Sequence, residues 1–200
     1  NLYVLRARLS VNNQTEVFDT RFGFREFWIE GKDFKLNGKT IRLRGRSIYN
    51  KRLRGLETHR NTLLKQKKYF DVNACRTVGR KRELQLAADE IGILFINKSA
   101  IWSVMHSYYR EGGEWFMANI KKEFEEWIKR DRNSPSTVIW DVENEMIRIS
   151  HKNIPWVKEL KDYVLELDTT RPVNFSGAGW FDQEQEMVHI HMQEHYTRIM

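Results

Sequence analysis

The sequence predicts an α/β fold of parallel strands and helices, preceded by a short segment made of strands. The first observation is a change of pattern near residue 33, where period-two alternation gives way to strand-like runs separated by helix-like runs. The second is Thr137–Trp140, a short apolar strand that leads directly into acidic residues. Strands that alternate with helices in this way indicate parallel βαβ units.

The first 32 residues read as strands and tight turns. Asn12-Asn13-Gln14, Gly31-Lys32-Asp33 and Asn37-Gly38 are turn signals, since glycine and asparagine tolerate the backbone conformations that such turns need. The strands expected between these turns are Leu2–Leu9, Glu16–Phe18 and Phe22–Ile29.

From residue 33 onward the pattern predicts six strands and four helices. The expected strands are Ile41–Ile48, Val72–Val78, Ile93–Asn97, Thr137–Val142, Val173–Ser176 and Val188–Met192. The expected helices are His59–Phe70, Arg82–Ile91, Glu114–Lys129 and Ile154–Leu167. A long loop is expected before Glu114, because Gly112 and Gly113 interrupt the pattern there.

Composition excludes several classes of protein. The 200 residues carry a net charge of +7, but the basic residues are widely spread and no nucleic-acid-binding motif accompanies them, so no nucleic-acid partner is expected. No apolar run approaches the roughly 18 residues of a membrane span, and no signal peptide is visible, which favours a cytoplasmic protein without a membrane partner. Cys75 is the one cysteine and lies in an apolar strand, where an inert buried thiol is the favoured interpretation.

Acidic residues gather at the end of the strand Thr137–Val142. Asp141 lies at the end of this strand, Glu143 and Glu145 follow it, and Asn144 stands between the two glutamates. Barrel enzymes place acid/base groups at the carboxyl ends of buried strands, so the cluster is a candidate active site. A solvated acidic loop is the alternative that spacing alone leaves open.

Ahead of this strand the chain reads Arg130-Asp131-Arg132-Asn133-Ser134-Pro135-Ser136, and the strand leads into Asn144-Glu145. These segments resemble glycoside hydrolase family 2, the family of β-galactosidase, β-glucuronidase and β-mannosidase, in which the turn reads R-D-R-N-H-P-S and the following strand ends in N-E. Five further segments match the family in the same order, at residues 21–25, 34–45, 73–77, 87–94 and 167–172.

The resemblance implies a (β/α)8 TIM-type barrel. Such barrels usually need about 250 residues, so the barrel is expected to be incomplete, with about six strands. Residues 1–32 would be the end of an immunoglobulin-like β-sandwich, and residues 33–200 a partial catalytic barrel. An open sheet leaves edge strands exposed, and we therefore expect either self-association or pairing with a segment that completes the barrel.

The same resemblance implies retaining hydrolysis of β-linked sugars, without a cofactor. Glu145 would be the general acid/base, and Asn144 would bind the sugar hydroxyl next to the reacting carbon. Arg44 and His191 match family positions at the sugar site. Trp102 lies on the loop after the third strand, where it could stack on a sugar or pack the loop onto the barrel. The nucleophile, a Glu after the seventh strand in the family, would lie beyond this chain.

Three departures from the family pattern fall at positions on the sugar side. No His follows Thr77, where the chain reads Val78; Lys98 ends the third strand in place of an acid; and Ser134 replaces a His. These departures keep open a second hypothesis, a diverged barrel without hydrolase activity that acts as a structural or interaction protein.

A metal site is a lesser alternative near the end of the chain. His189 and His191 are two residues apart on a predicted strand and so share a face, and His195 follows. Sugar contact by His191 is the favoured interpretation, and no metal is expected.

Overall fold

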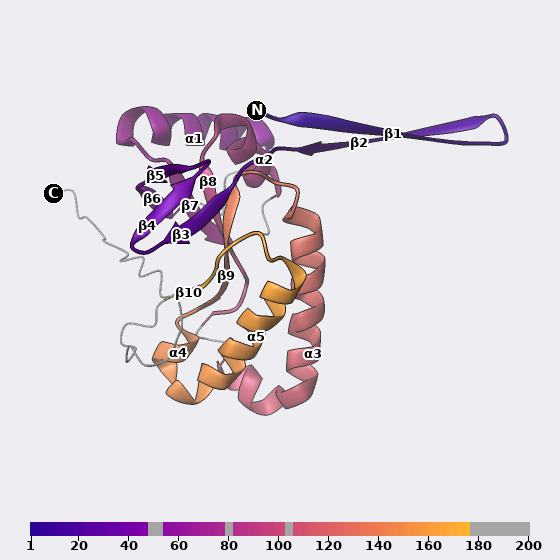
Figure 1. The fold of residues 1–200 in the computed structure, drawn as a ribbon. Helices are drawn as coiled ribbons and strands as arrows, with labels where there is room; N and C mark the ends of the chain where they lie inside the picture. The colour runs from indigo at the N-terminus through magenta and orange to yellow at the C-terminus, as the bar shows by residue number, and fades with distance from the viewer. Residues whose placement is uncertain (48–53, 79–81, 103–105, 177–200) are drawn as a thin grey trace.

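The computed structural model describes residues 1–200 except 48–53, 79–81, 103–105 and 177–200. Within these residues the fold has three parts: a two-stranded hairpin, a small antiparallel sheet, and a parallel sheet covered by helices (Figure 1). The parallel sheet has the order β10-β9-β8-β7-β6, which confirms the predicted α/β fold.

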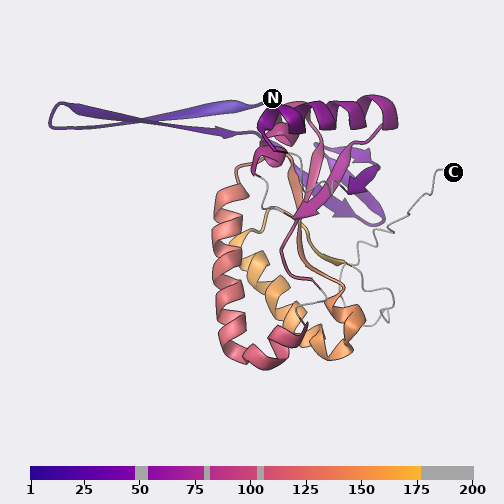
Figure 2. The same ribbon diagram turned by 180° about the vertical axis from the view of Figure 1, so that it is seen from behind.

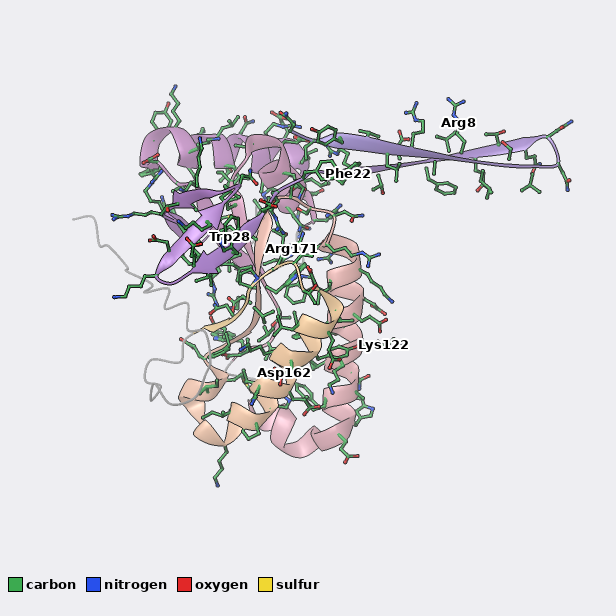
Figure 3. All side chains as sticks on the ribbon, viewed as in Figure 1. Arg8, Phe22, Trp28, Lys122, Asp162 and Arg171 are labelled. Carbon is green, nitrogen blue, oxygen red and sulfur yellow. The ribbon has the colours of Figure 1, made fainter. Side chains whose placement is uncertain are left out.

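The hairpin consists of β1 (Tyr3–Val11) and β2 (Gln14–Phe22), and it projects from the body of the protein (Figures 1 and 2). Asn12 and Asn13 both have positive φ, as a two-residue turn of this kind requires. Pairing places Tyr3, Leu5 and Phe18 on one face, whereas Arg8 and the Arg6–Asp19 ion pair lie on the other (Figure 3). The hairpin is therefore amphipathic, although its side chains are largely exposed.

The small sheet joins the hairpin to the body and covers one end of the parallel sheet. It contains β3 (Phe27–Glu30), β4 (Asp33–Leu36) and β5 (Lys39–Ile41). Phe27 is buried against Ala74, Ile96, Val138 and Ile139 of the parallel strands. The predicted strand Phe22–Ile29 is thus divided, because β2 ends at Phe22 and β3 begins only at Phe27.

The parallel strands begin at one edge of the sheet and end at the other. They are β6 (Gly45–Ser47), β7 (Ala74–Val78), β8 (Leu94–Lys98), β9 (Thr137–Asn144) and β10 (Val173–Ser176). We call the border of the sheet formed by the amino ends of the strands the amino edge, and the border formed by their carboxyl ends the carboxyl edge. Neither term refers to the outermost strands, β6 and β10. The described strands form an open sheet rather than a closed barrel. The predicted sixth strand, Val188–Met192, lies outside the described residues.

Helices cover the outer face of the sheet in two groups. α1 (Leu56–Phe70) and α2 (Arg82–Ile91) enclose a small core with β7 and β8 that includes Leu63, Leu84 and Phe95. α3 (His106–Asp131) and α5 (Ile154–Leu167) lie side by side (Figures 1 and 2) and enclose a larger core with β9 and β10. None of the helices in the described ranges has the length and apolar character of a membrane span.

The α/β part also departs from the predicted elements in several places. The first parallel strand is shorter than the predicted Ile41–Ile48, since Lys39–Ile41 belongs to the small sheet. The predicted loop before Glu114 is helical from His106, and Gly113 marks a kink with φ 48° instead of a break. A short helix α4 (Met146–Ile149) and the 3-10 turn η2 (His151–Asn153) were not predicted.

Candidate active site

The candidate site lies where β9 ends at the carboxyl edge. Side chains alternate between the two faces of a strand, so Trp140 and Val142 enter the core under α3 and α5, whereas Asp141 and Glu143 point to the inner face of the sheet. Glu145 follows in the left-handed conformation, with φ 65° and ψ 9°, and α4 begins immediately after it. The strand thus delivers buried acids and then turns sharply at Glu145.

A buried ion pair links β7 to β9 on the inner face. Arg76 Nε donates to Asp141 Oδ2 at 2.6 Å, and Asp141 is fully buried. Asn174 of β10 donates to the other oxygen, Oδ1, at 3.4 Å. Arg76 Nη2 also donates to Asn144 Oδ1 at 2.8 Å, so Arg76 orients the amide that the sequence assigned to sugar binding.

A second cation and a second acid share this buried face. Lys98 lies opposite Asp141 in the β8–β9 register and is 7% exposed. Glu143 is fully buried, and burial raises the pKa of its carboxyl to about 8, with a smaller upward contribution from the Asp141 charge. The Met146 N–H, which donates to Glu143 Oε2 at 2.7 Å, acts in the opposite direction on that pKa. The nearby Arg76 and Lys98 charges also lower this pKa, but burial outweighs them and favours the protonated form of Glu143.

Glu145 is the acid of this cluster that solvent can reach. It is partly exposed, in contrast to Asp141 and Glu143. Trp102, on the loop after β8, donates from Nε1 to Glu145 Oε2 at 3.3 Å and is itself 45% exposed. The structure therefore brings together three of the predicted site residues: Glu145, Asn144 and Trp102.

Polar contacts that sequence reasoning missed hold this turn in place. Ser99 Oγ donates to the Val142 carbonyl at 2.6 Å and accepts from the Ile101 N–H at 3.1 Å. Asn153 Nδ2 donates to the Met146 carbonyl at 2.6 Å. The turn that carries Glu145 is consequently tied to the loop after β8 on one side and to η2 on the other.

The remaining predicted site residues are not part of this cluster. Arg44 precedes β6 and lies at the amino edge, where its Nε donates to the Asp71 carbonyl at 2.9 Å. Its predicted convergence with Glu145 is wrong, because a residue before a strand lies at the opposite edge from a residue after one. His191 and the other two histidines of the possible metal site lie outside the described residues.

Arg76, Lys98 and Asp141 share a sequence pattern that indicates this charge network. Strands paired in parallel expose alternate residues on the same face, so a charged residue near the carboxyl end of each of three neighbouring strands predicts a buried charge network.

Within the described residues, no three His, Cys, Asp or Glu side chains are grouped so as to hold a metal ion.

The comparisons with known proteins agree with this geometry. A family model described as "Glycosyl hydrolases family 2, TIM barrel domain" matches residues 26–199. A β-glucuronidase from Streptococcus agalactiae is 30% identical over 172 residues, covering 72% of this chain and 27% of its own length. A β-galactosidase from Thermoanaerobacterium thermosulfurigenes is 25% identical over 178 residues, covering 86% of this chain and 24% of its own length. The chain thus spans about a quarter of these relatives.

Solved structures give the same result for the fold. A family 2 β-galacturonidase from Eisenbergiella tayi, solved with galacturonate bound, superposes with a TM-score of 0.75 at 27% identity, covering 88% of this chain and 33% of that one. A β-glucuronidase from Parabacteroides merdae gives a TM-score of 0.73 at 24% identity, covering 87% of this chain and 23% of that one.

Proposed function

Since the chain belongs to family 2 of the glycosyl hydrolases, through that family's TIM barrel domain, we propose that it forms the part of a retaining β-glycosidase that supplies the general acid/base, Glu145. The observation that carries the proposal is the position of Glu145 as a partly exposed carboxyl group at the carboxyl edge, beside Asn144 and Trp102. The named β-galactosidase and β-glucuronidase relatives support a β-linked sugar as the substrate.

Glu145 would act twice in such a reaction. It first donates its proton to the glycosidic oxygen as the bond to the sugar breaks, while a second carboxylate attacks the sugar carbon and forms a covalent glycosyl-enzyme. Glu145, now ionised, then takes a proton from water, and that water releases the sugar with its original configuration. We expect the second carboxylate to come from outside these 200 residues.

Neighbouring groups would position Glu145 and the sugar. The Trp102 N–H lies within hydrogen-bond distance of Glu145 Oε2, which restricts the rotation of that carboxyl group. Arg76 fixes the Asn144 amide through its oxygen, and the amide N–H groups are then the donors that a sugar hydroxyl would meet. Glu143 cannot replace Glu145 in this conformation, because it is fully buried and accepts the Met146 N–H.

The first test uses the 200-residue chain alone with aryl β-galactoside, β-glucuronide and β-mannoside. We expect no measurable turnover, since positioned acid catalysis contributes only about 10²–10⁴-fold and the nucleophile is missing. Clear hydrolysis that Glu145→Gln abolishes would show that another acid of this chain serves as the nucleophile.

The second test examines the role of Glu145 in a form of the protein that contains the complete barrel. Glu145→Gln should lower kcat/KM by about 10²–10⁴-fold for substrates whose leaving group needs a proton. The loss should be much smaller for a dinitrophenyl glycoside, whose leaving group needs none. Glu123→Gln, on the exposed face of α3, is the matched control and should leave both rates unchanged. An equal loss on both substrates would contradict the acid/base role.

Lys98 favours a second candidate function, a diverged barrel that binds or assembles without catalysis. A buried ammonium group stands at the end of β8, where the family usually has an acid, so the field at the site differs from the expected one. Absence of turnover by a complete barrel on all three aryl glycosides would favour this candidate. Turnover that Lys98→Glu increases would instead identify Lys98 as a change in a working enzyme.

The domain arrangement is a proposal as well. The apolar face of the β1–β2 hairpin fits the predicted role of residues 1–32 as the end of a β-sandwich. The outermost strands of the described sheet, β6 and β10, fit the predicted pairing with a completing segment or self-association. Sedimentation of the 200-residue chain tests the second point, and a stable monomer would contradict it.

A further inference from the structure

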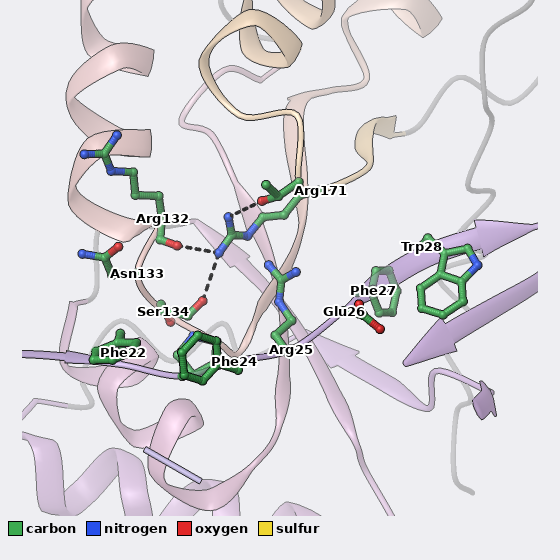
Figure 4. A pocket seen from close by; sticks show the side chains of 13 residues that line it. Phe22, Phe24, Arg25, Glu26, Phe27, Trp28, Arg132, Asn133, Ser134 and Arg171 are labelled. Atoms are coloured by element: carbon green, nitrogen blue, oxygen red, sulfur yellow. Dashed lines mark hydrogen bonds between the residues drawn. The ribbon is translucent and has the colours of Figure 1, made fainter. Parts of the chain in front are cut away.

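A pocket of about 600 Å³ opens at the amino edge, opposite the edge that carries Glu145. It lies between the segment that joins β2 to β3 and the turns that precede β9 and β10 (Figure 4). Its walls combine aromatic rings with guanidinium groups, chiefly those of Phe22, Phe24, Trp28, Arg25, Arg132 and Arg171. The proposed hydrolysis makes no use of it.

Arg25 and Arg171 differ in how their charges are compensated. Arg171 is buried, forms an ion pair with Asp168, and donates to the carbonyls of Thr137, Arg132 and Ser134. Arg25 donates from Nη2 to the Thr137 carbonyl at 2.7 Å, but its Nε is buried without an acceptor. Within the described residues, no carboxylate forms an ion pair with Arg25.

The charge of Arg25 persists at neutral pH despite this environment. Burial, and next the nearby Arg171 charge, lower the pKa of Arg25 to about 10, against a smaller opposing effect of Asp168. The guanidinium therefore stays protonated while it lacks an anionic partner. A largely buried charge without a counter-ion is unfavourable, so an anion against this guanidinium would be stabilising.

Aromatic rings lie next to this charge. Phe24 is 78% exposed and packs edge-on against Phe22, with ring centroids 5.5 Å apart. Figure 4 shows Phe24 and Phe22 on one side of Arg25, and Phe27 and Trp28 on the other. An exposed ring of this size is a surface on which an apolar group can be buried.

We propose that this pocket binds a carboxylate carried on an aromatic or other apolar group. The carboxylate lies against the Arg25 guanidinium and neutralises it, because guanidinium and carboxylate groups match in geometry and charge. The apolar group packs against Phe24 and Phe22. A free organic acid and an acidic side chain of a polypeptide share this chemistry, and the experiment separates the two sources.

The experiment titrates the 200-residue chain with three small probes and follows the Arg25 and Trp28 side-chain N–H signals by NMR. Phenylacetate carries both features, acetate lacks the ring, and phenylacetamide lacks the charge. We expect phenylacetate to bind about tenfold or more tightly than either of the others. Equal binding of phenylacetamide, or no binding of phenylacetate up to about 10 mM, would overturn the proposal.

Two variants and a control locate the site. Arg25→Gln should abolish phenylacetate binding, whereas Arg132→Gln, which removes an exposed charge from the same pocket, should change it by less than about threefold. If Arg25→Gln fails to fold, Phe24→Ala decides the matter: this exposed side chain can be removed without disturbing the core, and binding should weaken by about threefold or more. Unchanged binding in Phe24→Ala, or equal losses in the two arginine variants, would contradict the site.

A peptide arm distinguishes the sources of the carboxylate. Acetyl-Asp-Phe-amide is compared with acetyl-Asn-Phe-amide at the same concentrations. Binding of the Asp peptide at least as tight as that of phenylacetate assigns the pocket to a polypeptide partner, whereas binding of phenylacetate alone assigns it to a free organic acid. Indifference to the change from Asp to Asn would count against a carboxylate site of either kind.

Discussion

The two edges of the parallel sheet use buried charge in different ways. At the amino edge, buried charged groups bind backbone and side-chain partners that fix one turn against another: Arg171 binds three carbonyls, and Asp168 accepts from Trp140, Thr170 and Arg171. At the carboxyl edge, Arg76, Lys98, Asp141 and Glu143 are crowded on one face, and the pKa of Glu143 is raised to about 8. The buried charges at the amino edge thus stabilise the fold, whereas the carboxyl edge contains a carboxyl group, that of Glu143, whose raised pKa makes its charge depend on pH.

This comparison explains which residues reveal the family. The match to R-D-R-N-H-P-S at residues 130–136 and the Thr170-Arg171-Pro172 approach lie at the amino edge, where they pack turns together. Of the three family departures, Val78 and Lys98 fall at the carboxyl ends of their strands. Ser134 precedes β9 and lies at the amino edge, contrary to its expected position on the sugar side. Two of the three departures thus lie at the opposite strand ends from these family-matching turns.

The largest expected effect is on the amino edge. Arg171→Leu leaves Asp168 without its buried cation and removes a donor from the carbonyls of Arg132, Ser134 and Thr137, of which the last keeps Arg25. We expect the free energy of unfolding to fall by about 3–5 kcal/mol, measured by urea denaturation. Arg132→Gln, at an exposed neighbouring position, should change it by no more than about 0.5 kcal/mol. Similar free energies of unfolding for the two variants would contradict the stabilising role of the buried Arg171.

A somewhat smaller effect is expected from Asp141→Asn at the carboxyl edge. The change leaves Arg76 buried without its counter-charge, beside Lys98, and should cost about 3 kcal/mol. Adding Lys98→Met should restore part of this loss, because it removes the second cation from the same face. No recovery in the double variant would mean that Lys98 and Asp141 do not interact.

The raised pKa of Glu143 predicts that stability at the carboxyl edge depends on pH. The folded-state pKa of Glu143, about 8, lies above its ordinary value of 4.5, so the folded protein binds this proton more tightly than the unfolded chain. Its stabilising contribution is fully present below pH 4.5 and is lost as pH rises through about 8.

Glu143→Gln should therefore flatten the loss of stability across that window, by an amount on the order of a few kcal/mol. The glutamine oxygen can still accept the Met146 N–H. Urea denaturation at several pH values measures this effect, and parallel pH profiles for the two proteins would contradict it.

The smallest expected effect separates two tryptophans. Trp102→Phe removes an N–H that bonds a partly exposed Glu145, and should change stability by about 0.5 kcal/mol or less. Trp140→Phe removes a buried N–H that donates to Asp168 at 2.8 Å, and should cost about 1–3 kcal/mol. The reverse order would show that the loop after β8 contributes to stability.

Sequence patterns predicted the α/β class and most element positions because apolar periodicity is a local property. β10 and α5 match their predicted ranges, and β7 and β9 differ by two residues at one end. The helical start of α3 was missed because Gly113 adopts φ 48° inside a kink, which the sequence cannot distinguish from a loop.

The candidate site was predictable only in part. Asn144 and Glu145 follow directly from the end of one strand, and Trp102 comes from the loop beside it. The Arg76–Asp141 pair depends on the register between strands separated by 65 residues in the chain, which no single segment encodes. Arg44 was misplaced because the first parallel strand begins at Gly45, four residues later than the predicted start at Ile41.

The backbone of Glu145 has a consequence for laboratory evolution. Its left-handed conformation, with φ 65°, costs a side chain of this kind on the order of 1 kcal/mol, whereas glycine and asparagine tolerate it better. Selection of random variants for heat resistance alone would therefore enrich Glu145→Gly and Glu145→Asn. Such a selection would remove the proposed acid/base first, so any thermostabilised lineage of this protein must be screened for turnover at every round.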